Sequence, residues 1–510
     1  MLSLLVLAAV AADRPNVLLV ITDDQSAPHA SAYAASGDIA GAVPKSALHT
    51  PGFDRIAAAG HLFTHCYAAS PGCAPSRAGL LTGRHPWMLE QAGTHASSFP
   101  AKFPTYPDLL EDAGYFVGFT GKPWGPGDFR KGGRDRNPAG VDFNRHRLKP
   151  PAKGISNKDY ARNFETFLNE RDDGQPFCFW YGAQEPHRPF ADGYGRSLGK
   201  DPADAVVPPF LPDTPTVRSD LLDYYAEIEY ADAHLVRMLD ELDRRGELAD
   251  TLVIVTSDNG MAFPRAKANC YEYGFNVPLA VAWPARWTDG SQRHDEVVGF
   301  VDLTATILEA AGVRDPQTPN PTTGQSLLAA LGGDADAWPG VAFASRERHS
   351  SSRHKNGTYP QRAIRQGDHL YIVNDRPARW PAGDPRKFDG ETLGPPHGGY
   401  HDIDACPTLT ELIDRRSEFN DLFRLAVDKR PREELFNVAA DPGCVAPLIG
   451  PTVKPGPEVV AVLSELAERL EDERERTGDP RVTGDGDIWE TYPRYSAIRR
   501  FPKPPKTLPE

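Results

Sequence analysis

Residues 15–24, PNVLLVITDD, form an apolar run that ends in two carboxylates, Asp23 and Asp24. A run of this length, rich in Val and Ile, is typical of a buried strand in a parallel sheet. Open α/β sheets bind their ligands at the carboxyl ends of the strands. We therefore expect an α/β fold whose chemistry begins where this strand ends.

The same pattern recurs at residues 252–260, LVIVTSDNG, which end in Asp258 and Asn259. Together with Asp23 and Asp24, these side chains would offer four oxygen ligands, three of them anionic. Oxygen ligands without His or Cys suit a hard cation such as Ca²⁺ or Mg²⁺. One acidic pair alone is more typical of a helix cap or a turn. Two such pairs, taken with the motif that follows, favour a metal site.

A third segment, residues 73–84, CAPSRAGLLTGR, predicts a helix that begins at a cysteine. Pro75 suits the first turn of a helix, because its missing N–H would have no partner there. Gly83 is a typical residue to end that helix. The positive field at a helix N-terminus favours an oxyanion and a bound sulfate. The plainer alternative is a buried structural cysteine.

Cationic side chains follow two more apolar runs. Lys122 ends the strand expected at residues 115–122, and His187 follows the strand expected at residues 177–182. Lys267 lies shortly after the second acidic pair. A single His after a strand is usually a hydrogen-bonded surface residue. Its place within this set favours a role in catalysis.

Taken in order over residues 15–340, these segments resemble the type I, formylglycine-dependent sulfatase family. The resemblance implies an alkaline-phosphatase-like, mostly parallel sheet sandwiched by helices, with a smaller C-terminal α+β domain of antiparallel sheet and helix. It also implies that Cys73 is converted to formylglycine, whose hydrated aldehyde is the nucleophile. One Ca²⁺ ion would be held by Asp23, Asp24, Asp258, Asn259 and position 73.

The resemblance assigns roles to the cationic residues. Lys122, His187 and Lys267 would surround the scissile sulfate, and Arg77 would support the nucleophile. Cations neutralise charge on the sulfate oxygens, and a proton donor assists the leaving group. His187 is the expected donor.

One position departs from the family pattern. Most members have a His two residues after the strand-end Lys, where this chain has Trp124. An indole N–H donates a hydrogen bond but is neither an acid nor a base at neutral pH. Either another residue, such as His85 or His95, acts as the base, or the protein is a carbohydrate-binding pseudoenzyme.

Within the family, residues 207–225 and 256–271 are most similar to the heparan N-sulfatases. We expect hydrolysis of sulfate from a sulfated carbohydrate, with the N-sulfate of N-sulfoglucosamine in heparan-type glycans as the substrate group. The alternatives are an O-sulfatase on another polysaccharide and a phosphonate or phosphodiester hydrolase. A formylglycine-generating or sulfatase-maturing enzyme would be a partner. The expected substrate contacts are Trp124, Glu185, Arg188, Arg346, Arg348 and His349.

Length and charge limit the domain organisation, the location and the possible ligands of the protein. A chain of 510 residues is larger than one core usually supports. We expect a signal peptide at residues 1–12, a catalytic domain at 13–340, and a C-terminal subdomain and tail at 341–510. This predicts a secreted or periplasmic protein. A net charge of −14 argues against nucleic-acid binding, and no apolar run is long enough to span a membrane.

Apolar spacing predicts the remaining elements. Helices are expected from Arg218 to Arg245, from Asp302 onward, and over residues 457–476. Strands are expected at residues 279–283, 299–301, 341–345, 361–366 and 369–373.

If Cys73 is consumed, five of the six cysteines remain. Cys66 and Cys178 are expected to be buried thiols, and Cys406 and Cys444 could pair in an export compartment.

Overall fold

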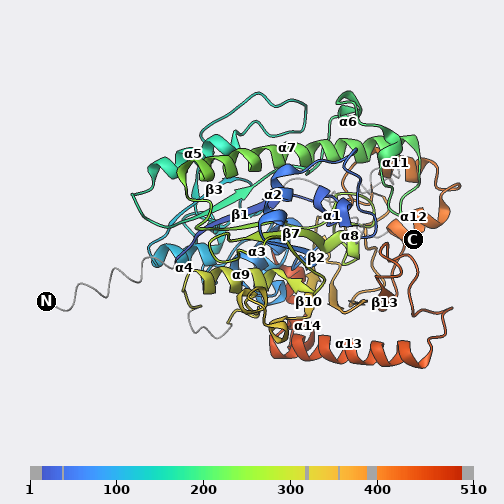
Figure 1. Cartoon of the computed structure of the whole chain (residues 1–510). Coiled ribbons are helices and arrows are strands. Elements are labelled where there is room, and N and C mark those ends of the chain that lie inside the picture. The colour runs from blue at the N-terminus through green and yellow to red at the C-terminus, as the bar shows by residue number, and fades with distance from the viewer. Residues whose placement is uncertain (1–13, 37–38, 316–320, 354–355, 387–398, 497–510) are drawn as a thin grey trace.

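The computed structural model describes residues 14–36, 39–315, 321–353, 356–386 and 399–496 (Figure 1). Its main sheet runs in the order β4, β3, β5, β1, β6, β7, β2, β8, and β9 also pairs with β2. The strands along this path are β4 (Val141–Asp142), β3 (Phe116–Gly121), β5 (Phe177–Gly182), β1 (Asn16–Thr22), β6 (Thr251–Ser257), β7 (Asn276–Ala282), β2 (His61–Tyr67), β8 (Gln292–His294) and β9 (Val298–Gly299). The five strands from β4 to β6 are parallel, and β7 is antiparallel to its neighbours β6 and β2.

Helices cover both faces of this sheet. Alternate residues of β1 point to opposite faces, so Leu18 and Leu19 belong to different hydrophobic clusters. The Leu18 face packs against α2 (Pro51–Ala59), α5 (Tyr160–Glu170) and α7 (Pro215–Arg245). The Leu19 face packs against α3 (Cys73–Thr82), α4 (Tyr106–Asp112) and α9 (Phe300–Ala310). Figure 1 shows α5 and α7 above the sheet and α3, α4 and α9 below it.

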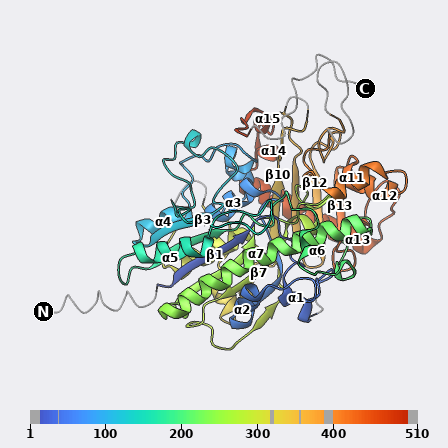
Figure 2. The same cartoon turned by 90° about the horizontal axis from the view of Figure 1, so that it is seen from above.

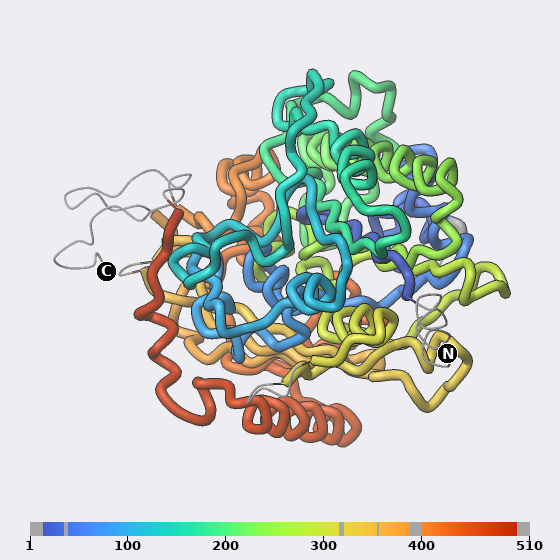
Figure 3. Tube along the Cα trace, turned by 90° about the vertical axis from the view of Figure 1, so that its left-hand side faces the viewer, coloured from blue at the N-terminus to red at the C-terminus, as the bar shows by residue number. Residues whose placement is uncertain are grey.

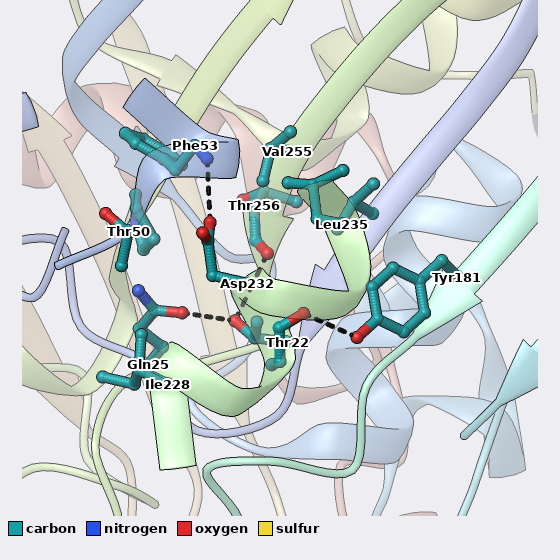
Figure 4. Close-up of a pocket in the computed structure, with 13 residues that line it drawn as sticks. Thr22, Gln25, Thr50, Phe53, Tyr181, Ile228, Asp232, Leu235, Val255 and Thr256 are labelled. Atoms are coloured by element: carbon teal, nitrogen blue, oxygen red, sulfur yellow. Dashed lines mark hydrogen bonds between the residues drawn. The ribbon is translucent and has the colours of Figure 1, made fainter. Parts of the chain in front are cut away.

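The α7 face is closely packed. Figure 4 shows a small cavity there, with Asp232 of α7 directed at the backbone nitrogen of Phe53. The Asp232 carboxylate accepts hydrogen bonds from Gly52 N at 2.7 Å and from Phe53 N at 2.8 Å, which satisfies the first turn of α2. The cavity volume is about 20 Å³. This is room for roughly one water molecule and not for a sugar.

A second, four-stranded antiparallel sheet follows the main sheet in the chain. It contains β10 (Val341–Arg346), β11 (Gln361–Gln366), β12 (His369–Asn374) and β13 (Glu433–Asn437). Leu466 and Leu470 of α13 (Pro457–Arg476) pack onto Ile364 and Tyr371 of this sheet. Figure 3 shows α13 along the edge of the molecule, and Figure 2 shows the second sheet on the side away from the N-terminus.

Shorter helices complete the fold. They are α1 (Ser31–Ser36), α6 (Tyr194–Ser197), α8 (Glu272–Phe275), α10 (Leu328–Leu331), α11 (Pro407–Asp414), α12 (Asn420–Val427), α14 (Pro480–Thr483) and α15 (Ile488–Thr491). Among the helices that the structure describes, none is both long and apolar enough to span a bilayer.

The predicted fold class is confirmed: a mostly parallel sheet lies between helices, and a smaller antiparallel sheet follows it. The helix expected from Arg218 begins earlier, at Pro215, because the Thr214 hydroxyl caps it by accepting from Val217 N. Gly246 ends it in the left-handed conformation, as expected.

The strand expected at residues 299–301 is present but shorter, and it begins one residue earlier. Only Val298 and Gly299 are extended, and α9 begins at Phe300. The Asp302 carboxylate lies inside the first turn and accepts from Gly299 N at 2.8 Å, so it caps the helix from within rather than before its start.

All six cysteines are buried free thiols. The expected burial of Cys66 and Cys178 is therefore confirmed, whereas Cys406 and Cys444, whose pairing the sequence left open, are both free. The expected signal peptide at residues 1–12 lies outside the described residues.

Candidate active site

The predicted polar side chains meet at one edge of the main sheet. Asp23 follows β1, Lys122 follows β3, and Asp258 follows β6. These strands are parallel, so their carboxyl ends share an edge. Backbone hydrogen bonds fix the approach: Asp23 N donates to Glu185 O at 3.1 Å, and Asp258 N donates to Thr22 O at 3.0 Å.

Cys73 is the first residue of α3, and its side chain is buried beside the acidic residues. Its Sγ lies 3.4 Å from Asp23 Oδ1. Burial, followed by the charge of Asp23, raises the pKa of the Cys73 thiol well above its ordinary range. A thiol held in its protonated form is a poor nucleophile. Burial in this site therefore disfavours the thiolate form of Cys73.

Four of the predicted ligand residues converge. Atoms of Asp23, Asp24, Cys73 and Asp258 lie within 4.8 Å of one another, and all four side chains are buried. Asn259 Nδ2 donates to Asp24 Oδ1 at 2.8 Å, while Asn259 Oδ1 has no hydrogen-bond partner among the described residues. Converging carboxylates and an unpartnered amide oxygen fit a hard divalent cation such as Ca²⁺.

Each acidic residue of this cluster also contacts one cation. Lys122 Nζ pairs with Asp23, Lys267 Nζ lies 2.6 Å from Asp24 Oδ2, and Arg77 Nε lies 2.7 Å from Asp258 Oδ2. These three carboxylates are thus paired with three cations, and Asp404 adds a fourth carboxylate 3.2 Å from Lys267 Nζ. A divalent ion would add a surplus of positive charge, which favours a bound anion such as a sulfate group.

Arg77 ties the helix to two strand ends. Besides Asp258, its guanidinium donates from Nη1 to the carbonyl oxygen of Lys122 at 2.7 Å. The neighbouring Ser76 hydroxyl donates to Asp258 O at 2.5 Å. These contacts hold the first turn of α3, and with it position 73, against the acidic cluster.

His187 presents one ring nitrogen to the site. Its Nδ1 lies 2.6 Å from the carbonyl oxygen of Arg188, a contact that requires an N–H at Nδ1. Its Nε2 lies 3.9 Å from Asp24 Oδ2, and 30% of the side chain is exposed. Burial, followed by the charge of Lys267, lowers the pKa of His187. The imidazole can therefore gain and lose a proton at Nε2 while Nδ1 fixes its orientation.

The family model described as Sulfatase matches residues 15–313. This chain belongs to the sulfatase family. The human protein named N-sulphoglucosamine sulphohydrolase is 30% identical over 477 residues, which cover 84% of this chain and 89% of the human protein. The enzyme class predicted from the sequence, a sulfuric ester hydrolase, is confirmed.

Solved structures share the fold. One is a protein in complex with its substrate D-glucosamine-2-N,6-O-disulfate, with a TM-score of 0.61 at 21% identity, covering 92% of this chain and 100% of that one. Another is the phosphonate monoester hydrolase of Agrobacterium radiobacter, with a TM-score of 0.62 at 16% identity, covering 91% of this chain and 96% of that one. At these identities the likeness shows the fold alone.

Trp124 of the sulfatase is packed rather than open. Its ring is 2% exposed and meets Phe99 edge to face at 5.2 Å. Its Nε1 donates to the carbonyl oxygen of Ala74 at 3.1 Å. The indole therefore supports the first turn of α3, and its N–H already has an acceptor.

The two alternative bases lie in different places. His85 Nε2 lies 2.8 Å from Glu473 of α13, so this ring belongs to the contact with the second sheet's helix. His95 lies beside His349, with ring centroids 4.6 Å apart. The Nδ1 of His349 would lie 3.0 Å from a Cβ atom placed on Gly72. His349 is thus the neighbour of the residue that precedes Cys73.

The remaining expected substrate residues hold protein partners in the sulfatase. Glu185 accepts from Ser156 N and from the Tyr160 hydroxyl, and both Nη atoms of Arg188 lie 2.8 Å from the Asp220 carboxylate. Glu185 lies two residues before His187 and Arg188 lies one residue after it. Their contacts therefore fix the backbone on both sides of His187. Arg348 and Arg346 are buried as well; Arg348 donates to the carbonyl oxygens of Tyr492 and Pro493, and Arg346 pairs with Asp402.

Sequence reasoning missed two residues beside the site. Asp404 Oδ2 lies 3.2 Å from Lys267 Nζ, and Trp180 Nε1 donates to the carbonyl oxygen of Lys122 at 3.0 Å. Trp180 lies on β5, two residues before the strand ends. Its position near the strand end could have indicated from the sequence that it lies beside the site. Asp404 comes from a loop far along the chain, and no local pattern indicates its partner.

Proposed function

We propose that this sulfatase removes sulfate from a sulfated carbohydrate, with the N-sulfate of N-sulfoglucosamine in heparan-type glycans as the reacting group. The reaction class rests on one observation: Lys122, Lys267 and Nε2 of His187 surround position 73 beside a cluster of buried carboxylates. The choice of the N-sulfate is supported by the 30% identity to the human sulphohydrolase over most of both chains.

Two groups would complete the site. Asp23, Asp24, Asp258 and Asn259 would hold one Ca²⁺ ion together with position 73. Formylglycine made from Cys73 by a maturation enzyme would supply a hydrated aldehyde as the nucleophile. The chain's own residues then have distinct tasks. Lys122 and Lys267 neutralise the sulfate oxygens, Arg77 holds Asp258, and His187 delivers a proton from Nε2 to the departing nitrogen or oxygen.

Further assignments belong to the same proposal. Residues 13–340 form the catalytic domain, residues 341–510 form the C-terminal subdomain and tail, and residues 1–12 direct export to a secreted or periplasmic location. Glu185 and Arg188 act on the substrate through the position of His187, since their polar groups hold protein partners. Trp124 and His349 act beside position 73, through their contacts with Ala74 and Gly72, and Arg346 and Arg348 act on the substrate from the buried side of the site.

Three other functions remain as rivals. An O-sulfatase would use the same charges on a different linkage. A phosphonate or phosphodiester hydrolase could use the same fold, which this chain shares with the Agrobacterium radiobacter enzyme. A carbohydrate-binding pseudoenzyme is motivated by Trp124, whose N–H is not available for proton transfer.

The deciding experiment uses protein co-expressed with a maturation enzyme, after peptide mass has established conversion of Cys73. Glucosamine carrying an N-sulfate and a 6-O-sulfate is the substrate, and NMR reports which sulfate leaves. Loss of the N-sulfate supports the proposal, and loss of the 6-O-sulfate alone replaces it with an O-sulfatase. Release of neither, with turnover of a phosphonate monoester, favours the phosphonate hydrolase. Binding without any turnover favours the pseudoenzyme.

A further inference from the structure

Arg346, at the end of β10, and Arg353, in the loop that follows, are buried and share the carboxylate of Asp402. Arg346 Nη2 and Arg353 Nη2 each lie 2.6 Å from Asp402 Oδ2. Both also donate to the carbonyl oxygen of Pro381, at 2.7 Å in each case. Each arginine side chain is 3% exposed.

This cluster has more donors than acceptors. Nε and Nη1 of Arg346 and Nη1 of Arg353 have no hydrogen-bond partner among the described residues. Asp402 accepts in addition from the hydroxyls of Ser350 and Ser352, so its lone pairs are occupied. Two guanidinium groups against one carboxylate leave a net charge of +1. Burial, with repulsion from Arg353 opposing the attraction of Asp402, lowers the pKa of Arg346 to about 10.

Two other buried arginines, Arg188 and Arg362, are each matched to carboxylates. Arg188 pairs with both oxygens of Asp220. Arg362 pairs with Asp479 and also with Glu347. The Tyr359 ring lies 5.1 Å from Arg346 and 5.4 Å from Arg353, which stabilises their charge but supplies no acceptor in the guanidinium plane. Buried donors without a partner are rare in native proteins and point to a missing ligand.

The arginine pair is adjacent to the catalytic cations. Asp402, which holds the pair, and Asp404, which contacts Lys267, belong to one loop. Two residues of extended chain span about 7 Å. On the other side, Ser345 N, next to Arg346, donates to the carbonyl oxygen of Ala69 in the segment that leads to Cys73. An anion on the arginine pair would thus be within reach of a sugar whose sulfate lies at Lys267.

We propose that Arg346 and Arg353 bind a second oxyanionic group of the substrate, either a further sulfate on the reacting sugar or the carboxylate of an adjoining uronic acid. The site would then select saccharides with two anionic groups over those with one. Arginine presents a planar fork of donors that matches both kinds of oxyanion. This inference rests on the proposed function for its substrate, but the anion site itself is tested independently.

The first test uses selenate as a sulfate analogue. Crystals of Cys73→Ala protein with Ca²⁺ are soaked in selenate, and anomalous scattering locates the selenium atoms. We expect a selenate within hydrogen-bond distance of both arginines, absent in the Arg353→Gln version of the same protein. No selenate at the pair overturns the inference, whether or not sugars bind.

The second test measures binding to Cys73→Ala protein by calorimetry, which needs no turnover. The probes are glucosamine N-sulfate, glucosamine N,6-disulfate, and a disaccharide of N-sulfoglucosamine with a uronic acid. We expect one doubly anionic probe to bind at least about tenfold more tightly than the singly sulfated sugar, since charge-assisted hydrogen bonds are the strong ones. The probe that gains affinity identifies the source of the second anion.

Variants separate this role from folding. Arg353→Gln should remove the gain, and Arg353→Lys should restore part of it by returning the charge without the fork. Arg379, which pairs with Glu490 and is partly exposed, is the matched control, and Arg379→Gln should keep the full gain. Melting temperatures establish that each variant is folded. Equal affinity for all three probes, or a gain that survives Arg353→Gln, overturns the inference. If no probe binds while selenate does, the proposed glucosamine substrate fails and the anion site stands.

Discussion

The indole nitrogen of Trp124 donates a hydrogen bond to the carbonyl oxygen of Ala74 at 3.1 Å. The residue that stands in place of the family's histidine is therefore a packing element under the first turn of α3. Gly127 completes this packing, because a Cβ atom placed there would lie 2.4 Å from the indole ring. A proton acceptor at this end of β3 must come from another residue.

Replacing Trp124 should affect stability more than proton transfer. Trp124→Ala should cost about 3–5 kcal/mol in the free energy of unfolding, because it leaves a large cavity. Trp124→Phe keeps most of the packing and should cost roughly 0.5–1.5 kcal/mol for the lost hydrogen bond. Chemical denaturation measures both. The pH profile of kcat/KM in Trp124→Phe should match that of the parent, and a displaced profile would give the indole a role in the chemistry.

Ca²⁺ should stabilise the protein, because three buried carboxylates converge at the proposed metal site in the folded chain and not in the unfolded chain. At a hundred times its dissociation constant, the ion should add about 2.7 kcal/mol. Melting of Cys73→Ala protein with Ca²⁺, with Mg²⁺ and with a chelator measures the effect without maturation. Equal stabilisation by Mg²⁺ would argue against a calcium site.

Asp24→Asn is a clean companion variant for the metal site. Asp24 has a φ of +76°, and asparagine tolerates this left-handed conformation. The substitution therefore removes one charge without adding backbone strain. The Ca²⁺ concentration that gives the parent's stabilisation should rise about tenfold or more. An unchanged calcium requirement would remove Asp24 from the ligand set.

His187→Ala should slow reactions in proportion to the leaving group's need for a proton. On a sugar sulfate or sulfamate, kcat/KM should fall by about 10²–10⁴-fold. On an aryl sulfate with an acidic phenol the loss should be much smaller. His146→Ala, which changes a partly exposed ring bonded to Thr166, is the control. Equal losses on both substrates would exclude His187 as the proton donor.

The pH dependence of kcat/KM in the parent enzyme also tests His187 as the proton donor. A donor must hold its proton, so kcat/KM should fall as the pH rises through the pKa of His187. Burial, followed by Lys267, holds that pKa below its ordinary value of 6.5 in the free enzyme. The alkaline decline should therefore begin below pH 6.5 and be absent in His187→Ala.

The sequence predicted those parts of the site that follow from strand ends. Asp23, Lys122 and Asp258 each terminate an apolar run, and parallel pairing alone places such residues at one edge. Caps and periodicity likewise predicted α7 and α13. The contacts of Arg353 with Asp402 and of Lys267 with Asp404 were not predictable. They join loops distant in sequence, and no local pattern encodes which acid meets which base.

The same limit applies where a local rule has two outcomes. The helix was expected from Asp302 onward, but it begins at Phe300, and the Asp302 carboxylate reaches back to Gly299 from the third helical position. Both placements satisfy a helix N-terminus, and only packing of Leu303 and Ile307 against the sheet selects one. Tertiary contacts thus decided the boundary that the cap alone left open.

Glu227 of α7 should make stability fall with rising pH. Its side chain is 1% exposed, and neither carboxyl oxygen has a hydrogen-bond partner among the described residues. Burial, followed by the charge of Glu185, raises the pKa of Glu227 from 4.5 to about 9. Between these values the folded protein keeps a proton that the unfolded chain has released. The free energy of unfolding therefore decreases as the pH rises across this window, by up to about 1.4 kcal/mol per pH unit.

Glu227→Gln replaces a neutral acid by a neutral amide of similar shape and should remove this slope. Its stability relative to the parent should rise steadily from pH 5.5 to pH 8.5 in chemical denaturation at each pH. Glu241 lies on the same helix, but Arg244 and Arg245 lower its pKa against the opposing effect of burial. Glu241→Gln should therefore shift stability by a constant amount across the same range, because Glu241 is ionised in both states there. Parallel pH curves for Glu227→Gln and the parent would mean that the buried Glu227 carboxyl is ionised in the folded protein, and a cation would then have to lie beside it.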